Sequence, residues 1–128
     1  MKDSEVASAI ELARQVVGAT TDVPAEPNVV QRLDTAAEYV LVRLGPSGGP
    51  GWIAAVDPAA RDVMSWAVNS SGGATVPTVA GAAPDYVWVP SSVSPSPLYP
   101  LLRLRTSEGP RFVDITGAVH DHLTGHRG

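Results

Sequence analysis

The sequence predicts an α+β domain in which an N-terminal helix packs on a curved antiparallel sheet built from two related strand-turn-strand units. An amphipathic N-terminal stretch predicts the helix. Short runs rich in branched and aromatic residues, separated by Gly, Pro and Ser turns, predict the strands. A repeat links two of these runs. The 128 residues, 44% of them hydrophobic, suit a single domain over residues 1–128 with one core.

The first predicted element is a helix over residues 4–18. Val6, Ile10, Ala13 and Val17 fall on one side at helical spacing, and Gly18 is a typical end signal. We expect this apolar stripe to pack on the sheet. Residues 28–33 are compatible with a short helix or a strand, and the paired valines before a clear strand favour the strand.

The next elements belong to the repeat. Tyr39-Val-Leu-Val-Arg43-Leu44 is echoed by Tyr99-Pro-Leu-Leu-Arg103-Leu104, and each copy continues through a turn with Ser, Gly and Pro to a strand ending in Val-Asp. The predicted order is a first hairpin unit over 38–68, a linker over 69–85 with a short strand at 75–79, and a second unit over 86–123. A repeated hairpin indicates sheet architecture rather than catalysis, because one hairpin alone cannot bury its apolar face.

The first unit resembles the PepSY module in Tyr39-Val-Leu-Val, Trp52-Ile-Ala-Ala-Val-Asp57 and Val63-Met-Ser-Trp66. The resemblance covers Glu38–Trp66, and Leu98–Leu123 resembles the module more loosely through Val113-Asp114-Ile-Thr116-Gly117. The first unit departs from the family pattern, since Pro58-Ala-Ala-Arg61 replaces a Thr-Gly turn. The resemblance implies a cystatin-like helix on a sheet and a non-catalytic interaction domain that inhibits or chaperones a protease partner.

Strand alternation separates two faces in each unit. Val40, Val42 and Leu44, matched by Leu102 and Leu104, form an apolar face that we expect to meet the helix. The opposite, mixed face carries the candidate binding residues Tyr39, Arg43, Tyr99, Arg103 and Arg105. Arginine forks hold carboxylates in bidentate fashion, so this face predicts a platform for an acidic or aromatic segment of a peptide or protein partner. Ordinary cross-strand packing on a solvent-facing sheet is the structural alternative.

Three further hypotheses stay open. A partner strand could add to an exposed strand edge, or that edge could pair with itself in a homodimer. The C-terminal histidines His120, His122 and His126 could hold zinc in a metal-dependent hydrolase, with Asp114 or Asp121 as a further ligand, although this region is a typical place for fraying. Asp57 and Asp114, at equivalent strand ends, fit Asx-type turns better than acid and base catalysis.

Composition excludes other functions. Without cysteine there is no disulfide or thiolate chemistry, and a net charge of −4 with a single lysine argues against a nucleic-acid partner. We expect no signal peptide, no membrane span, no cofactor and a cytoplasmic location. The serines at 91–96 lie among prolines without a nucleophile elbow. A non-catalytic binding module is therefore favoured over an enzyme.

Overall fold

A computed structural model describes residues 1–46, 48–70, 75–91 and 94–121. Within these residues the chain forms one helix and an eight-stranded, mostly antiparallel sheet, which confirms the α+β class. The elements are α1 (Asp3–Val17), β1 (Ala25–Arg32), β2 (Glu38–Leu44), β3 (Gly51–Asp57), β4 (Asp62–Asn69), β5 (Tyr86–Trp88), β6 (Leu101–Thr106), β7 (Gly109–Val113) and β8 (Val119–His120).

Helix α1 matches its prediction closely. The Glu5 side chain accepts the backbone N–H of Lys2 at 3.3 Å, and Gly18 ends the helix in the left-handed conformation with φ 74°. Ala9 and Ala13 are fully buried on the face toward the sheet. Small residues there allow the helix to lie close to the strands. In the described chain this helix is too short to cross a membrane.

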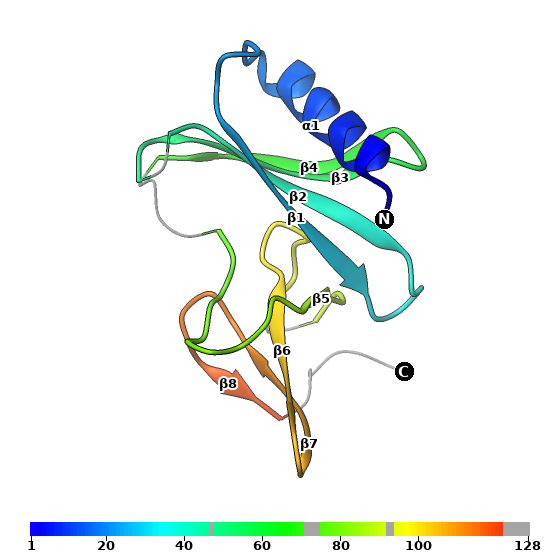
Figure 1. The fold of residues 1–128 in the computed structure, drawn as a ribbon, viewed down its shortest axis with the longest axis vertical. Coiled ribbons are helices and arrows are strands. Elements are labelled where there is room, and N and C mark those ends of the chain that lie inside the picture. Colours follow the sequence, from blue (N-terminus) through cyan, green and yellow to red (C-terminus); the bar gives the residue numbers. More distant parts are fainter. Residues whose placement is uncertain (47, 71–74, 92–93, 122–128) are drawn as a thin grey trace.

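The sheet has the order β4-β3-β2-β1-β5-β6-β7-β8. Strands β1 to β4 form an antiparallel meander, and Val30–Arg32 at the end of β1 pairs in parallel with β5. The remaining strands follow as antiparallel neighbours, with Pro100 directly before β6, where it removes no hydrogen bond from the strand. Figure 1 shows α1 on one side of the β1–β4 layer and the β5–β8 half on the other.

The β1–β4 layer is therefore covered on both faces. The cluster below α1 contains Val40, Val42, Leu44, Ala54 and Val56 together with Ala9 and Ala13. The cluster on the opposite face contains Val30, Tyr39, Leu41, Ile53 and Ala55 together with Trp88 and Leu98. The first cluster confirms the expected apolar face of β2, and the second shows that the mixed face is also interior.

Two expectations about the second half are wrong. Residues 75–79 form bends and irregular chain rather than a strand. Leu102 and Leu104 do not meet the helix, because among the described elements α1 contacts only β1 to β4. The physical reason is the parallel junction between β1 and β5, which carries the second hairpin to the side of the layer away from α1.

Candidate functional site

The mixed face of β2 is not an open platform. Tyr39 is 1% exposed, meets Trp88 edge-on with ring centroids 6.1 Å apart, and donates its hydroxyl hydrogen to the carbonyl of Pro97 at 2.7 Å. Burial raises the pKa of this tyrosine, so its hydroxyl stays a neutral donor. Tyr39 therefore attaches the loop before β6 to the sheet, which corrects the expectation that it faces a partner.

Arg43 is also interior, with 7% of its surface exposed. Its guanidinium donates to the carbonyl of Pro46 at 3.1 Å and to that of Gly49 at 3.0 Å, both in the loop between β2 and β3. These bonds provide hydrogen-bond donors for loop carbonyl groups that point toward Arg43. A buried arginine engaged in this way closes its own hairpin and is not available to a carboxylate from another protein.

The other three predicted binding residues lie in the second half of the chain and do not join the first two. Tyr99 is 46% exposed in the loop before β6. Arg103 forms a bidentate pair with Asp85 at 2.9 and 3.2 Å, and the exposed Arg105 lies 3.9 Å from the same carboxylate. The structure therefore does not bring the five residues together on one exposed face.

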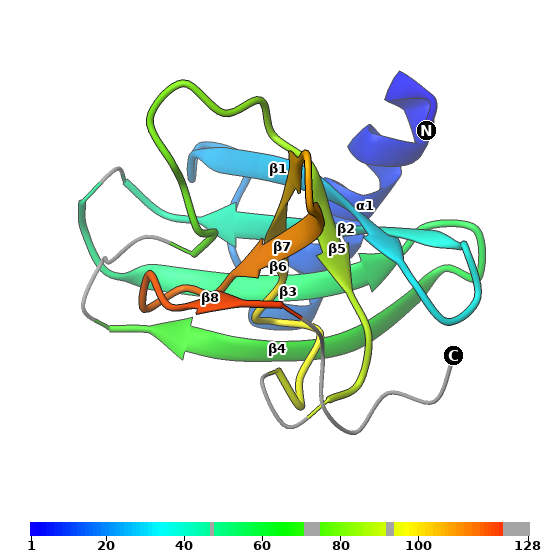
Figure 2. The ribbon, with the colours of Figure 1, turned by 90° about the horizontal axis from the view of Figure 1, so that it is seen from below.

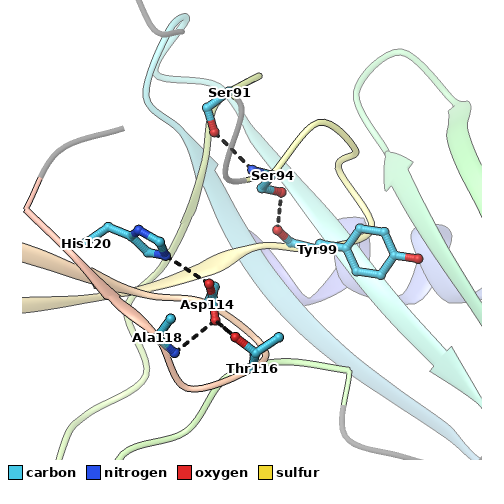
Figure 3. A network of polar contacts seen from close by, with 7 residues as sticks. All are labelled: Ser91, Ser94, Tyr99, Asp114, Thr116, Ala118 and His120. Carbon is cyan, nitrogen blue, oxygen red and sulfur yellow. Dashed lines mark hydrogen bonds and ion pairs between the residues drawn. The ribbon is translucent and has the colours of Figure 1, made fainter. Parts of the chain in front are cut away.

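The predicted histidine cluster is described at one position. His120 lies on β8, and its Nε2 is 2.8 Å from Oδ2 of Asp114. Figure 3 shows the two side chains facing one another. His122 and His126 lie outside the described residues. Within the described ranges there is no group of three residues that could hold a metal.

Asp114 has a structural role in the turn between β7 and β8. Its Oδ1 accepts the backbone N–H groups of Thr116 at 2.9 Å and Ala118 at 3.0 Å. Burial alone would raise the pKa of Asp114, but hydrogen bonds from His120, Thr116 and Ala118 outweigh it and lower the pKa to about 2. Asp57 likewise accepts the N–H groups of Ala59 at 3.1 Å and Ala60 at 3.2 Å. The predicted Asx-type turns are confirmed at both positions.

The serines before β6 hold their own loop. The Ser91 hydroxyl accepts the N–H of Ser94 at 3.1 Å, while the Ser94 hydroxyl donates to the carbonyl of Tyr99. Both contacts are drawn in Figure 3. The indole N–H of Trp88 donates to the carbonyl of Ser94 at 3.2 Å. Ser94 is 1% exposed. The described part of this segment, which includes Ser94 and Leu98, is a packed cover for the sheet.

A further candidate is the edge of the sheet at β4. In the described chain this strand pairs with β3 alone, and Figure 2 shows it along the border of the β1–β4 layer. Trp66 is 49% exposed and Val68 is 64% exposed, although both are large apolar side chains. The only charge of the strand is on Asp62, its first residue. One long border of backbone donors and acceptors is thus flanked by exposed apolar groups.

A small pocket of about 140 Å³, lined by both apolar and polar groups, lies beside this edge. Its lining joins the two halves of the chain, because Ile53 and Ala67 come from the β3–β4 pair and Tyr99 and Ile115 from the second half. Tyr99 and Ile115 are 46% and 38% exposed. The sequence predicts an exposed strand edge but does not assign it to β4. The signal that could have found it is position, since β4 ends the meander before a Gly-rich segment.

Comparisons of the chain with protein-family models, with curated proteins and with solved structures gave no match. The candidate site is therefore defined by the geometry of this chain alone: the edge of β4 and the pocket beside it.

Proposed function

We propose that this protein is a small non-catalytic binding module that receives an extended segment of a protein partner along β4. The observation that carries the proposal is the outer edge of β4 from Asp62 to Val68, whose described strand partner, β3, lies on one side only. An added strand would use the outward N–H and C=O groups of β4, as in β-augmentation.

The residues of β4 support this function. Natural sheets protect free edges with lysine, proline or a bulge, because unpaired edges associate with other strands. The irregularity in the β3–β4 pairing lies between Ala55 and Val56, near the start of β4, and leaves the pairing from Ser65 to Asn69 regular. That part carries no charge and exposes Trp66 and Val68. An interaction edge has these properties, whereas a protected edge does not.

We also propose a cystatin-like or PepSY-like arrangement for the first half of the chain. The helix crossing a four-stranded antiparallel meander, α1 with β1 to β4, supports a cystatin-like or PepSY-like arrangement. The β2–β3 and β6–β7 hairpins support the relation between two strand-turn-strand units. The inhibitor-like or chaperone-like role that the resemblance implies agrees with a module that binds an extended protein segment.

A selection from a random peptide library displayed on phage tests the function. The edge variant combines Trp66→Lys and Val68→Lys, which place charges beside the open edge without changing a buried residue. Val16→Lys is the matched control, because Val16 is 42% exposed on the helix and is not part of β4. We expect selected peptides to lose binding to the edge variant and to keep it with the control. Peptides that bind both variants equally would refute the proposal.

Self-pairing of β4 in a homodimer is the second candidate, and the strand sequence favours it in one register. An antiparallel pair centred between Ser65 and Trp66 places Asp62 opposite Asn69 and Val63 opposite Val68, so no like charges meet. Sedimentation equilibrium separates the candidates. A dimer that the edge variant converts to a monomer supports self-pairing, and a monomeric wild-type protein removes it.

A further inference from the structure

The pocket beside β4 has the size of one side chain. Its volume of about 140 Å³ is close to the roughly 150 Å³ of an apolar cavity that holds a benzene molecule. It is far below the roughly 300 Å³ at which small-molecule sites begin. A phenylalanine or leucine side chain on an added strand therefore fits it better than a free ligand does.

The lining places this pocket on a definite face of the sheet. Ile53 belongs to the cluster on the side away from α1, and Ala67, its register partner on β4, packs against the same cluster. An added strand that directs a side chain into the pocket must point that side chain away from the helix. The alternate side chains of such a strand would then lie beside Trp66 and Val68, whose partners Ala54 and Trp52 belong to the helix side.

A pair of carboxylates lies at the other end of the same edge. Asp62, the exposed first residue of β4, is in register with Asp57, the last residue of β3. Like charges in register repel, and none of the ion pairs among the described residues involves either aspartate. Arg32 interacts electrostatically with Asp57, but it forms its ion pair with Asp34, at 2.8 Å. A cationic side chain from a partner would relieve this repulsion.

Strand β3 gives the spacing between the two features. The positions opposite Ala67 and Asp62 are Ile53 and Asp57, which are four residues apart and on the same face. β4 has one more residue than β3 between these positions, because of the irregularity between Ala55 and Val56. A strand added in antiparallel orientation to β4 runs in the direction of β3 and, where it passes this irregularity as β3 does, covers the same length. Its residue at the pocket therefore comes four positions before its residue at the carboxylates.

We propose that the partner segment carries a phenylalanine- or leucine-sized residue followed, four positions later, by lysine or arginine. This inference rests on the proposed function and specifies its ligand: an extended, antiparallel segment with an apolar anchor and a basic residue. Both groups point away from α1.

Two synthetic peptides of identical composition test the order of the groups. The first is acetyl-Thr-Phe-Thr-Val-Thr-Arg-Thr-amide, and the second exchanges its Phe and Arg. Binding is measured by fluorescence of the protein, since Trp66 lies on β4 and the peptides contain no tryptophan, and is located by amide hydrogen exchange of β4. We expect the first peptide to bind about tenfold more tightly, and Phe→Ala in it to weaken binding about tenfold.

A charge exchange tests the basic position separately. Asp62→Lys should reverse the preference between the Arg peptide and the same peptide with Glu in its place, because Asp62 is exposed and leaves the core unchanged. If both peptides bind with equal affinity and both protect the amides of β4 from exchange, this inference is overturned and the proposed edge function stands. If neither these peptides nor library peptides protect β4, both the inference and the function fail.

Discussion

Replacing Tyr39 with phenylalanine separates a structural role from a binding role at this position. The hydroxyl of Tyr39 donates to the Pro97 carbonyl at 2.7 Å, and this bond attaches the loop before β6 to β2. Its loss removes one partly buried hydrogen bond and leaves the ring packed edge-on to Trp88. Removing one such donor costs about 1 kcal/mol of unfolding free energy, which lowers the melting temperature by about 4 °C.

The assay is urea unfolding followed by tryptophan fluorescence, with the m-value as a check that the transition keeps its size. Tyr99→Phe is the matched control, because it removes the same hydroxyl from a residue that is 46% exposed and should change stability by less than about 0.5 kcal/mol. Tyr39→Ala should cost about 3–5 kcal/mol, since it also empties a buried site. Equal stability of wild type and Tyr39→Phe would refute the structural reasoning.

Two further predictions concern turns. In Gly51→Ala the new Cβ would lie 1.9 Å from the Leu44 carbonyl oxygen, so we expect thermal unfolding to show a loss of stability above about 2 kcal/mol. In Gly18→Ala no atom lies within 4 Å of the new Cβ, and the left-handed φ of 74° alone should cost about 1 kcal/mol. A smaller loss at Gly51 would contradict the tight β2–β3 hairpin. The pKa of Asp114 is lowered from 3.8 to about 2, so its stabilisation is complete above about pH 4 and is lost as the pH falls toward 2. In Asp114→Asn the melting temperature should change less with pH between about 4 and 2 than it does in the wild type. The same pH dependence in both proteins would contradict the structural role of the Asp114 carboxylate.

Local patterns predicted much of the first half of the fold. The stripe from Val6 to Val17 identified α1, and Gly18 marked its end within one residue. Alternation in Tyr39–Leu44 identified which side chains meet the helix, because the side-chain period of a strand separates its faces without knowledge of the rest of the chain. The Asx turns at Asp57 and Asp114 were equally predictable, since an aspartate at a strand end bonds the backbone just after it.

The candidate site was harder to predict because its exposure depends on distant contacts. Tyr39 and Arg43 alternate with apolar residues and so resemble a solvent-facing pattern, yet Trp88 and Leu98, far along the chain, cover Tyr39. The polar groups of Tyr39 and Arg43 are satisfied by loop carbonyls, which no short-range pattern reveals. The similarity between the two repeat copies wrongly predicted equivalent roles for Arg43 and Arg103. Arg43 binds carbonyls of its own hairpin loop, whereas Arg103 pairs with Asp85.

Because the second half of the chain covers one face of the β1–β4 layer, the β4 edge lies beside the contact between the two halves. Among the described residues the backbone pairing between the two halves is short: it covers Val30–Arg32 and the bond from the Leu33 N–H to the Trp88 carbonyl at 2.9 Å. Their docking therefore depends on the packed cluster that contains Tyr39 and Trp88. The pocket beside β4 is lined from both halves, by Ile53 and Ala67 on one side and by Tyr99 on the other. A side chain bound there would contact both halves and stabilise their docking by the free energy of its own burial. Strand addition at β4 would therefore stabilise the contact between the halves as well as extend the sheet.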